Sequence, residues 1–141
     1  MVITPIVNDG RINRSKTTLN KIVAATISLL RKNNNGQIPT AQEIAVKSGV
    51  GIRTVFRHID DMEGLIEEVN RRYLNDLENY ILKNNPTQNS KDQRIEHVIK
   101  ERFYLYNTYQ HVFNLTITSL NNSNAIRTGF IKFNHILRQR F

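Results

Sequence analysis

The 141-residue chain has no cysteine, no tryptophan and only three prolines. The absence of cysteine excludes disulfides, zinc–thiolate sites and cysteine nucleophiles. No apolar run approaches the roughly 18 residues that a membrane-spanning helix requires. The first residues also lack the basic segment followed by an apolar run that marks a signal peptide. We therefore expect a cytoplasmic protein of one or two small domains, without a membrane partner.

Catalytic and metal-binding motifs are also missing. The sequence contains no GxSxG, no HExxH and no glycine-rich phosphate loop, and its six glycines are scattered. His97 and Glu101 stand at the spacing of two metal ligands on one helix face, but two ligands are too few and the sequence offers no third. We expect neither an enzyme nor a metal or other cofactor.

Acidic residues are scarce at the start of the chain. Residues 1–59 hold nine Lys and Arg against two acidic residues, a net charge of +7, whereas residues 60–83 carry −4 and residues 84–141 carry +5. Lys and Arg that neutralise phosphates supply most of the sequence-independent affinity for DNA. The basic block therefore suits a nucleic-acid partner, although it is also compatible with a merely solvated surface.

What the chain does have is a pattern of two short helices that begins at Thr40. Thr40 and Glu43 form a capping box, which starts the first helix. The Ser-Gly-Val-Gly segment at 48–51 ends it, and Gly49 suits the left-handed conformation of helix ends. A second helix then runs from about Ile52 to Ile59. Such a helix-turn-helix presents its second helix to the DNA major groove, but similar pairs also occur in ordinary helical proteins.

The second of these helices has two different faces. At about 100° per residue, Val55 and Ile59 fall on one side and form a stripe suited to the core. The opposite arc mixes two arginines with two apolar side chains: Ile52, Arg53, Phe56 and Arg57. Arginine pairs with O6 and N7 of guanine, and apolar side chains contact thymine methyl groups. This face therefore suits base recognition, while Ile52, at its boundary, suits the core equally.

A longer stretch, residues 16–65, combines this helix pair with an apolar helix before it. Its marked positions are Ile22, Val23, Ala24, Ala25, Leu29, Leu30, Thr40, Ile44, Ala45, Gly49, Val50, Thr54, Val55, Phe56, His58, Ile59 and Leu65. Together they resemble the DNA-binding region of the tetracycline-repressor (TetR/AcrR-like) family of transcriptional regulators. The resemblance implies an all-α fold, with an N-terminal three-helix helix-turn-helix DNA-binding domain at 1–61 and a helical regulatory domain for ligand binding and dimerisation at 62–141.

The resemblance also implies a function. It predicts a homodimer that binds a palindromic operator in double-stranded DNA and responds to an unknown small-molecule effector, and so a sequence-specific transcriptional regulator, most simply a ligand-responsive repressor. Under this hypothesis the bases are contacted by Ile52, Arg53, Phe56 and Arg57. The phosphate backbone is contacted or positioned by Thr40, Lys47, Thr54 and His58.

Three positions depart from the family's pattern. Gly51 replaces a capping residue, Phe56 replaces a tyrosine whose hydroxyl reaches a phosphate, and Met62 replaces a lysine. These departures leave an alternative open, a helical protein-interaction module that kept the fold and lost DNA binding. A small-molecule carrier without a DNA role is a third reading, against which the basic first block argues. Salt dependence separates a DNA binder from the other two, because binding at many phosphates releases many counterions.

Helical periodicity extends over the rest of the chain. We expect a first helix at about 16–32 with Ser15 as its N-cap, preceded by a basic arm of Arg11, Arg14 and Lys16 that suits the DNA backbone or minor groove. Further helices are expected at about 62–82, 91–106 and 108–120, and from 125 onward, with Ser90 and Gln93 as a second capping box and a break near Asn107. The core face of the helix at 91–106 is expected to hold Ile95, Val98, Ile99, Arg102 and Tyr106.

The second half also holds most of the aromatic residues. The resemblance implies a small-molecule pocket there, with Arg102, Tyr106 and Tyr109 as polar lining and Phe113 as an apolar wall, although such a stripe is also typical of a plain core. The resemblance further implies two more helices, which pack against the partner subunit. We therefore expect an incomplete regulatory domain or a different mode of dimerisation, in which a partner covers Phe130, Ile131, Phe133 and Ile136.

Overall fold

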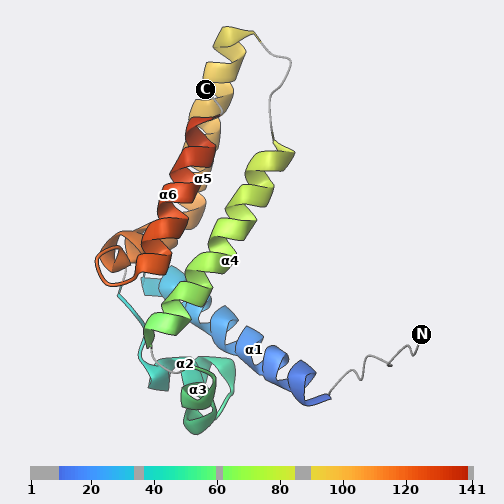
Figure 1. Ribbon diagram of the computed structural model, residues 1–141, viewed down its shortest axis with the longest axis vertical. Coiled ribbons are helices and arrows are strands. Elements are labelled where there is room, and N and C mark those ends of the chain that lie inside the picture. Colours follow the sequence, from blue (N-terminus) through green and yellow to red (C-terminus); the bar gives the residue numbers. More distant parts are fainter. Residues whose placement is uncertain (1–9, 34–36, 60–61, 85–89, 140–141) are drawn as a thin grey trace, which may run out of the picture.

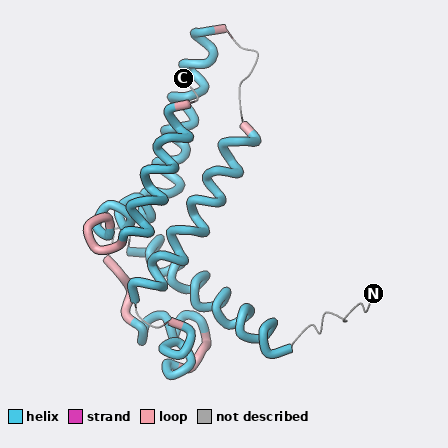
Figure 2. Tube along the Cα trace, viewed as in Figure 1, coloured by secondary structure: helices cyan, strands magenta, loops and turns pink. Residues whose placement is uncertain are grey.

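The computed structural model describes residues 10–33, 37–59, 62–84 and 90–139, which form six α-helices and no strand (Figures 1 and 2). The helices are α1 (Gly10–Asn33), α2 (Ala41–Ser48), α3 (Ile52–His58), α4 (Met62–Lys83), α5 (Lys91–Ser119) and α6 (Asn124–Arg138). The expectation of an all-α fold is therefore confirmed over these ranges. No helix within them is long and apolar enough to cross a membrane.

The helices form two groups, α1 to α3 and α4 to α6. The groups meet where α1 packs against α4 and α5. In Figure 1, α4, α5 and α6 stand upright, with α5 running in the opposite direction to the other two. Helix α1 crosses their lower ends and contacts α2, α3, α4 and α5. The main core is continuous through all six helices, with Ile22, Ile44, Val55, Val69, Leu115 and Ile126 as members from successive helices. A displacement of α4 therefore acts directly on α1, which in turn packs against α2 and α3.

The local signals for α2 and α3 are confirmed. The Oγ1 atom of Thr40 accepts a hydrogen bond from the Glu43 backbone N–H at 3.3 Å, and the Thr40 N–H donates to the Glu43 carboxylate at 2.8 Å. The pKa of the Glu43 carboxyl group is lowered, first by the bond from the Thr40 N–H and second by a bond from the Thr40 hydroxyl. Gly49 ends α2 with φ 67°, a left-handed conformation that favours glycine. This turn sets the angle at which α3 leaves α2.

Helix α1 begins at Gly10, which corrects the expectation of a start near Lys16. Ser15 is therefore an interior helical residue and not an N-cap, and Arg11, Arg14 and Lys16 belong to the helix rather than to an arm. No proline interrupts residues 10–33, and the hydroxyls of Thr17 and Thr18 donate to backbone carbonyls four residues earlier. These bonds satisfy the two hydroxyl groups within the helix.

Helix α5 is continuous, so the expected break near Asn107 is wrong. Neither Asn107 nor Thr108 is a strong helix breaker, and the burial of Leu105 and Val112 continues in register across them. The Ser90–Gln93 capping box at its start is confirmed.

The expected core face of α5 is also wrong. Of the five residues placed on it, only Val98 is buried, while Ile95, Ile99 and Tyr106 are exposed and Arg102 is half-buried. The buried side of α5 instead holds Val98, Glu101, Leu105, His111, Val112, Leu115, Thr116 and Ser119. The helix has two apolar sides. The side that holds Leu105 and Val112 packs against α4 and α6, and the side that holds Ile95 and Ile99 stays exposed.

Helices α4 and α6 cover each other's apolar faces in part. The buried residues of α4 include Leu65, Ile66, Val69, Tyr73, Leu77 and Ile81. In α6, Phe133 is buried, which corrects the expectation that a partner must cover it, and Phe130 and Ile136 are half-buried. Of the four α6 residues assigned to a partner, only Ile131 is exposed. Phe133 is buried because it packs with Leu77 and Ile81 of α4 and Leu105 of α5.

Candidate functional site

The side chains of α3 divide as its spacing predicts. Val55 and Ile59 belong to the main core, where they pack with residues of α1 and α2. Arg53, Phe56 and Arg57 are exposed on the other side, and Phe56 is 59% exposed. Ile52 also counts as exposed, which places it with this outer face rather than with the core. The outer face of this short helix therefore presents two guanidinium groups and two apolar groups, while Val55 and Ile59 hold its inner face in the core.

The four residues proposed for phosphate contacts lie in different environments. Lys47 is exposed in the last turn of α2, whereas Thr54 and His58 are half-buried. Thr40 is exposed, but its hydroxyl donates to the Glu43 carboxylate at 2.8 Å. Thr40 must therefore exchange that bond before it donates to a phosphate, while Lys47 needs no such change.

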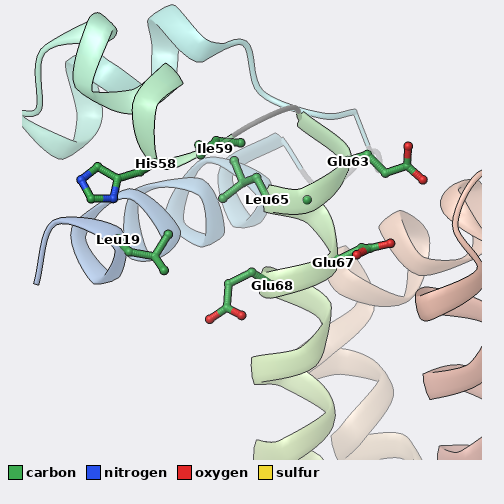
Figure 3. Close-up of a pocket in the computed structure, with 8 residues that line it drawn as sticks. Leu19, His58, Ile59, Glu63, Leu65, Glu67 and Glu68 are labelled. Carbon is green, nitrogen blue, oxygen red and sulfur yellow. The ribbon is translucent and has the colours of Figure 1, made fainter. Parts of the chain in front are cut away.

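The first turns of α1 carry further positive charge. Leu19 of α1 and His58 of α3 line the same cleft (Figure 3), and the N-terminal turns of α1 extend beyond this contact and away from α3 (Figure 1). Arg11, Arg14 and Lys16 are all exposed. Within residues 10–33 and 37–59, Glu43 is the only acidic residue beside nine Lys and Arg. This part of the chain presents almost pure positive charge.

A cleft of about 430 Å³ with the opposite charge lies where α1, α3 and α4 meet (Figure 3). Its lining includes three carboxylates, on Glu63, Glu67 and Glu68. Two of them have partners, because Glu68 pairs with Arg71 and Arg72 at 2.8 and 2.7 Å and Glu67 accepts a hydrogen bond from Ser123. The hydrogen bond from Arg71 is the main reason why the pKa of Glu68 is lowered. These carboxylates make the cleft unfavourable for anions.

A small cavity between α4, α5 and α6 contains two of the four residues expected to bind a ligand. Tyr109 and Phe113 line it, together with Asn70, Tyr73, Leu74, Leu77, Val112, Thr116, Phe130 and Phe133. Tyr106 is exposed on the outer side of α5 instead. Arg102 is half-buried, and its Nη2 donates to the carbonyl of Leu137 at 3.2 Å. The structure thus groups Tyr109 with Phe113 but does not bring Tyr106 or Arg102 to this cavity.

Two buried polar pairs at this cavity were missed by the sequence analysis. Thr116 Oγ1 donates to Asn70 Oδ1 at 3.2 Å, and Tyr73 Oη lies 2.7 Å from His111 Nε2. The Asn70 Nδ2 group has no hydrogen-bond partner among the residues that the structure describes. Burial is the main cause that lowers the pKa of His111, and it raises the pKa of Tyr73. The available signal was the presence of Asn70 and His111 within otherwise apolar helical stripes.

The cavity is small. It offers about 10 Å³ to the centre of a water-sized molecule, which is roughly the room that one water needs. A larger ligand requires movement of the half-buried rings of Phe113 and Phe130, which form part of its wall. Within the described ranges, no three His, Asp or Glu residues lie close enough to hold a metal ion.

No protein-family model matches this chain, and no curated protein matches it. The resemblance to the tetracycline-repressor family therefore depends only on the marked residues within 16–65.

Proposed function

We propose that this chain is a sequence-specific DNA-binding transcriptional regulator that acts as a ligand-responsive repressor. The observation that carries the proposal is the division of α3, which exposes Arg53, Phe56 and Arg57 while Val55 and Ile59 pack in the core. Because its inner face is packed in the core, the helix holds the backbone of its outer residues in a fixed position. Rigid presentation is what base recognition in a major groove requires.

In this proposal, the outer face of α3 contacts bases and its surroundings contact phosphates. Arg53 and Arg57 pair with guanines, and Ile52 and Phe56 contact thymine methyl groups. The phosphates are neutralised or positioned by Lys47, Thr54, His58 and, after exchange of its hydrogen bond, Thr40. The exposed first turns of α1 add further cations, from Arg11, Arg14 and Lys16.

Two such chains bind a palindromic operator as a homodimer in the proposed mechanism. Their α3 helices enter successive major grooves roughly 34–36 Å apart. An effector that enters between α4, α5 and α6 displaces α4, and α4 shares its core with α1 and α3. The effector weakens DNA binding only to the extent that it prefers the displaced state.

Selection from a randomised duplex pool at two salt concentrations tests the proposal. We expect an enriched palindrome and a steep decrease in affinity with salt, since several phosphates are neutralised. Enrichment of a single half-site would mean that DNA recognition is present and dimerisation is not. Weak, unselective binding at both salt concentrations would overturn the proposal.

A helical protein-interaction module is a second candidate, favoured by apolar exposure near α3. Val46 is 75% exposed on α2 and Phe56 is 59% exposed on α3, and both suit a protein partner. Gly51 also leaves the start of α3 without a side-chain cap. This candidate has lost DNA binding and predicts no enriched sequence and no steep salt dependence, so the same selection experiment separates the two.

A further inference from the structure

Helix α5 carries a line of large apolar side chains in contact with solvent. Their exposed fractions are 45% for Ile95, 63% for Ile99, 71% for Phe103, 59% for Tyr106 and 58% for Ile117. We refer to these five residues as the outer stripe. Single exposed apolar residues are common on protein surfaces, but a contiguous row marks an interaction site.

The spacing places the outer stripe on one face. Ile95, Ile99, Phe103 and Tyr106 follow at intervals of three or four residues, which is the spacing of residues that lie above one another on a helix. Ile117 lies on the same face beyond Gln110 and Phe113, which are half-buried, and Phe113 also packs against the core. None of these seven side chains is charged. The stripe extends over most of α5, which gives a long, uncharged and nearly straight surface.

The outer stripe is not needed for the packing of α5 within the chain. Val98, Leu105 and Val112, on a different side of the helix, make that contact and are buried. The helix therefore has one apolar side for α4 and α6 and a second one without a packing partner among the described residues. Such a second side is typical of a helix that packs in an assembly.

We propose that the outer stripe of α5 is the surface through which two copies of this chain pair. This inference rests on the proposed function, which requires two α3 helices in one assembly. A fully exposed large apolar or aromatic side chain presents roughly 150–250 Å², so the two aromatic residues and three isoleucines expose on the order of 500 Å² per copy. Complete burial of the stripe in both copies removes about 1,000 Å² from water, which is the lower limit for a specific interface.

The charge of the chain gives the pairing a distinctive dependence on salt. Each copy carries a net charge of +8, so two copies repel one another at long range. The stripe itself is uncharged, and its burial therefore removes no charged group from water. Salt screens the repulsion and leaves the apolar contact intact, so dimerisation strengthens with salt. DNA binding weakens with salt, so the two equilibria respond in opposite directions.

Sedimentation equilibrium of the purified chain without DNA tests the proposal. We expect a dimer whose dissociation constant falls as salt rises from about 0.1 to 0.5 M, a range over which the screening length shortens. Ile99→Lys should raise the dissociation constant at least tenfold. Leu82→Lys is the matched control, because Leu82 is 68% exposed and lies on α4, outside the stripe. Circular dichroism verifies that both variants keep their helices.

Cysteine cross-linking locates the contact, since the chain has no cysteine of its own. In a symmetric pair, a residue near the two-fold axis meets its own counterpart. We expect at least one of Ile99→Cys, Phe103→Cys and Tyr106→Cys to form an intermolecular disulfide under mild oxidation. Lys100→Cys, on an exposed residue outside the stripe, should not.

A monomer at tens of micromolar in high salt, equal losses of dimer affinity in Ile99→Lys and Leu82→Lys, or no stripe-specific disulfide would overturn the pairing. None of these measurements contains DNA. Failure of DNA binding is therefore distinguishable from failure of dimerisation.

Discussion

The hydroxyl of Tyr73 lies 2.7 Å from Nε2 of His111, and both residues are buried, one on α4 and the other on α5. Their rings meet edge to face, with centroids 5.6 Å apart. The pKa of His111 is lowered by burial and by the positive charge of Arg31 on α1, so the ring is neutral at neutral pH. Tyr73 then donates to Nε2, and Nδ1 carries the ring proton.

This arrangement predicts a loss of stability in mild acid. A histidine whose pKa is lower in the folded state binds more protons when unfolded, so the free energy of unfolding is highest above about pH 6.5. It should decrease as the pH falls below that value, towards the lowered pKa of His111. The carboxylates of Glu43, Glu68 and Glu96, whose pKa values are lowered from 4.5, contribute only at more acidic pH.

Urea unfolding between pH 8 and pH 5 measures this effect. His111→Gln removes the titrating group and should flatten the decrease between pH 6.5 and 5, whereas His135→Gln, at an exposed position of α6, should leave it unchanged. An unchanged slope in His111→Gln would show that another group is responsible. Tyr73→Phe should cost about 1–3 kcal/mol at pH 8, because it leaves a buried ring nitrogen without its donor.

Asn70 and Thr116 should show strongly non-additive effects on stability. Thr116→Val removes the hydroxyl that bonds Asn70 Oδ1, and Asn70 Nδ2 already lacks a partner among the described residues. The whole buried amide is then unsatisfied, at a cost of about 1–3 kcal/mol. Adding Asn70→Leu removes the amide and should recover most of that loss. A double variant as unstable as the sum of the two single variants would contradict this account.

The elements that could be predicted from the sequence are those with local chemical signals. The Thr40–Glu43 and Ser90–Gln93 capping boxes and the left-handed Gly49 each depend on two to four neighbouring residues, and all three are present. The two faces of α3 were also predictable, because only one of them is apolar enough for a core.

The wrong predictions concern helix bounds and buried faces for which neighbouring residues give no signal. The start of α1 and the supposed break in α5 lie in stretches without proline, where a helix continues unless something stops it. The orientation of α5 depends on which of two apolar sides α4 and α6 cover, and periodicity within α5 carries no information on that choice. The partners of His111 and Asn70 are likewise 38 and 46 residues away in sequence, so only the tertiary fold brings them together.

The turn between α2 and α3 predicts opposite effects of one substitution at two glycines. Gly49 has φ 67°, so Gly49→Ser should lower the free energy of unfolding by about 1–2 kcal/mol. Gly51, with φ −60°, is the uncapped N-cap of α3, and Gly51→Ser should raise it by a few tenths of a kcal/mol, since serine caps slightly better than glycine. A Cβ atom meets nothing within 4 Å at either position, so steric contact does not explain the difference. Chemical denaturation measures both, and equal effects would contradict the argument.

Arg53 and Lys47 should separate recognition of sequence from affinity for DNA. If Arg53 pairs with a guanine, Arg53→Ala should cost about 1–3 kcal/mol on the selected operator and relax the preference at that base pair. Lys47→Ala should weaken binding to all sequences alike and reduce the salt slope by about 1. Lys100→Ala, at an exposed residue of α5 paired with Glu96, is the control and should change neither quantity.

Fluorescence anisotropy with the operator and with single-base variants, at several salt concentrations, gives both quantities for each protein. Unchanged discrimination in Arg53→Ala would mean that the outer face of α3 does not read bases. A loss of discrimination in Lys47→Ala as large as that in Arg53→Ala would place the reading residues on α2 instead. The opposite salt dependence expected for dimerisation requires that affinities be compared at protein concentrations where the α5 pairing is saturated, because otherwise the salt slope mixes two equilibria.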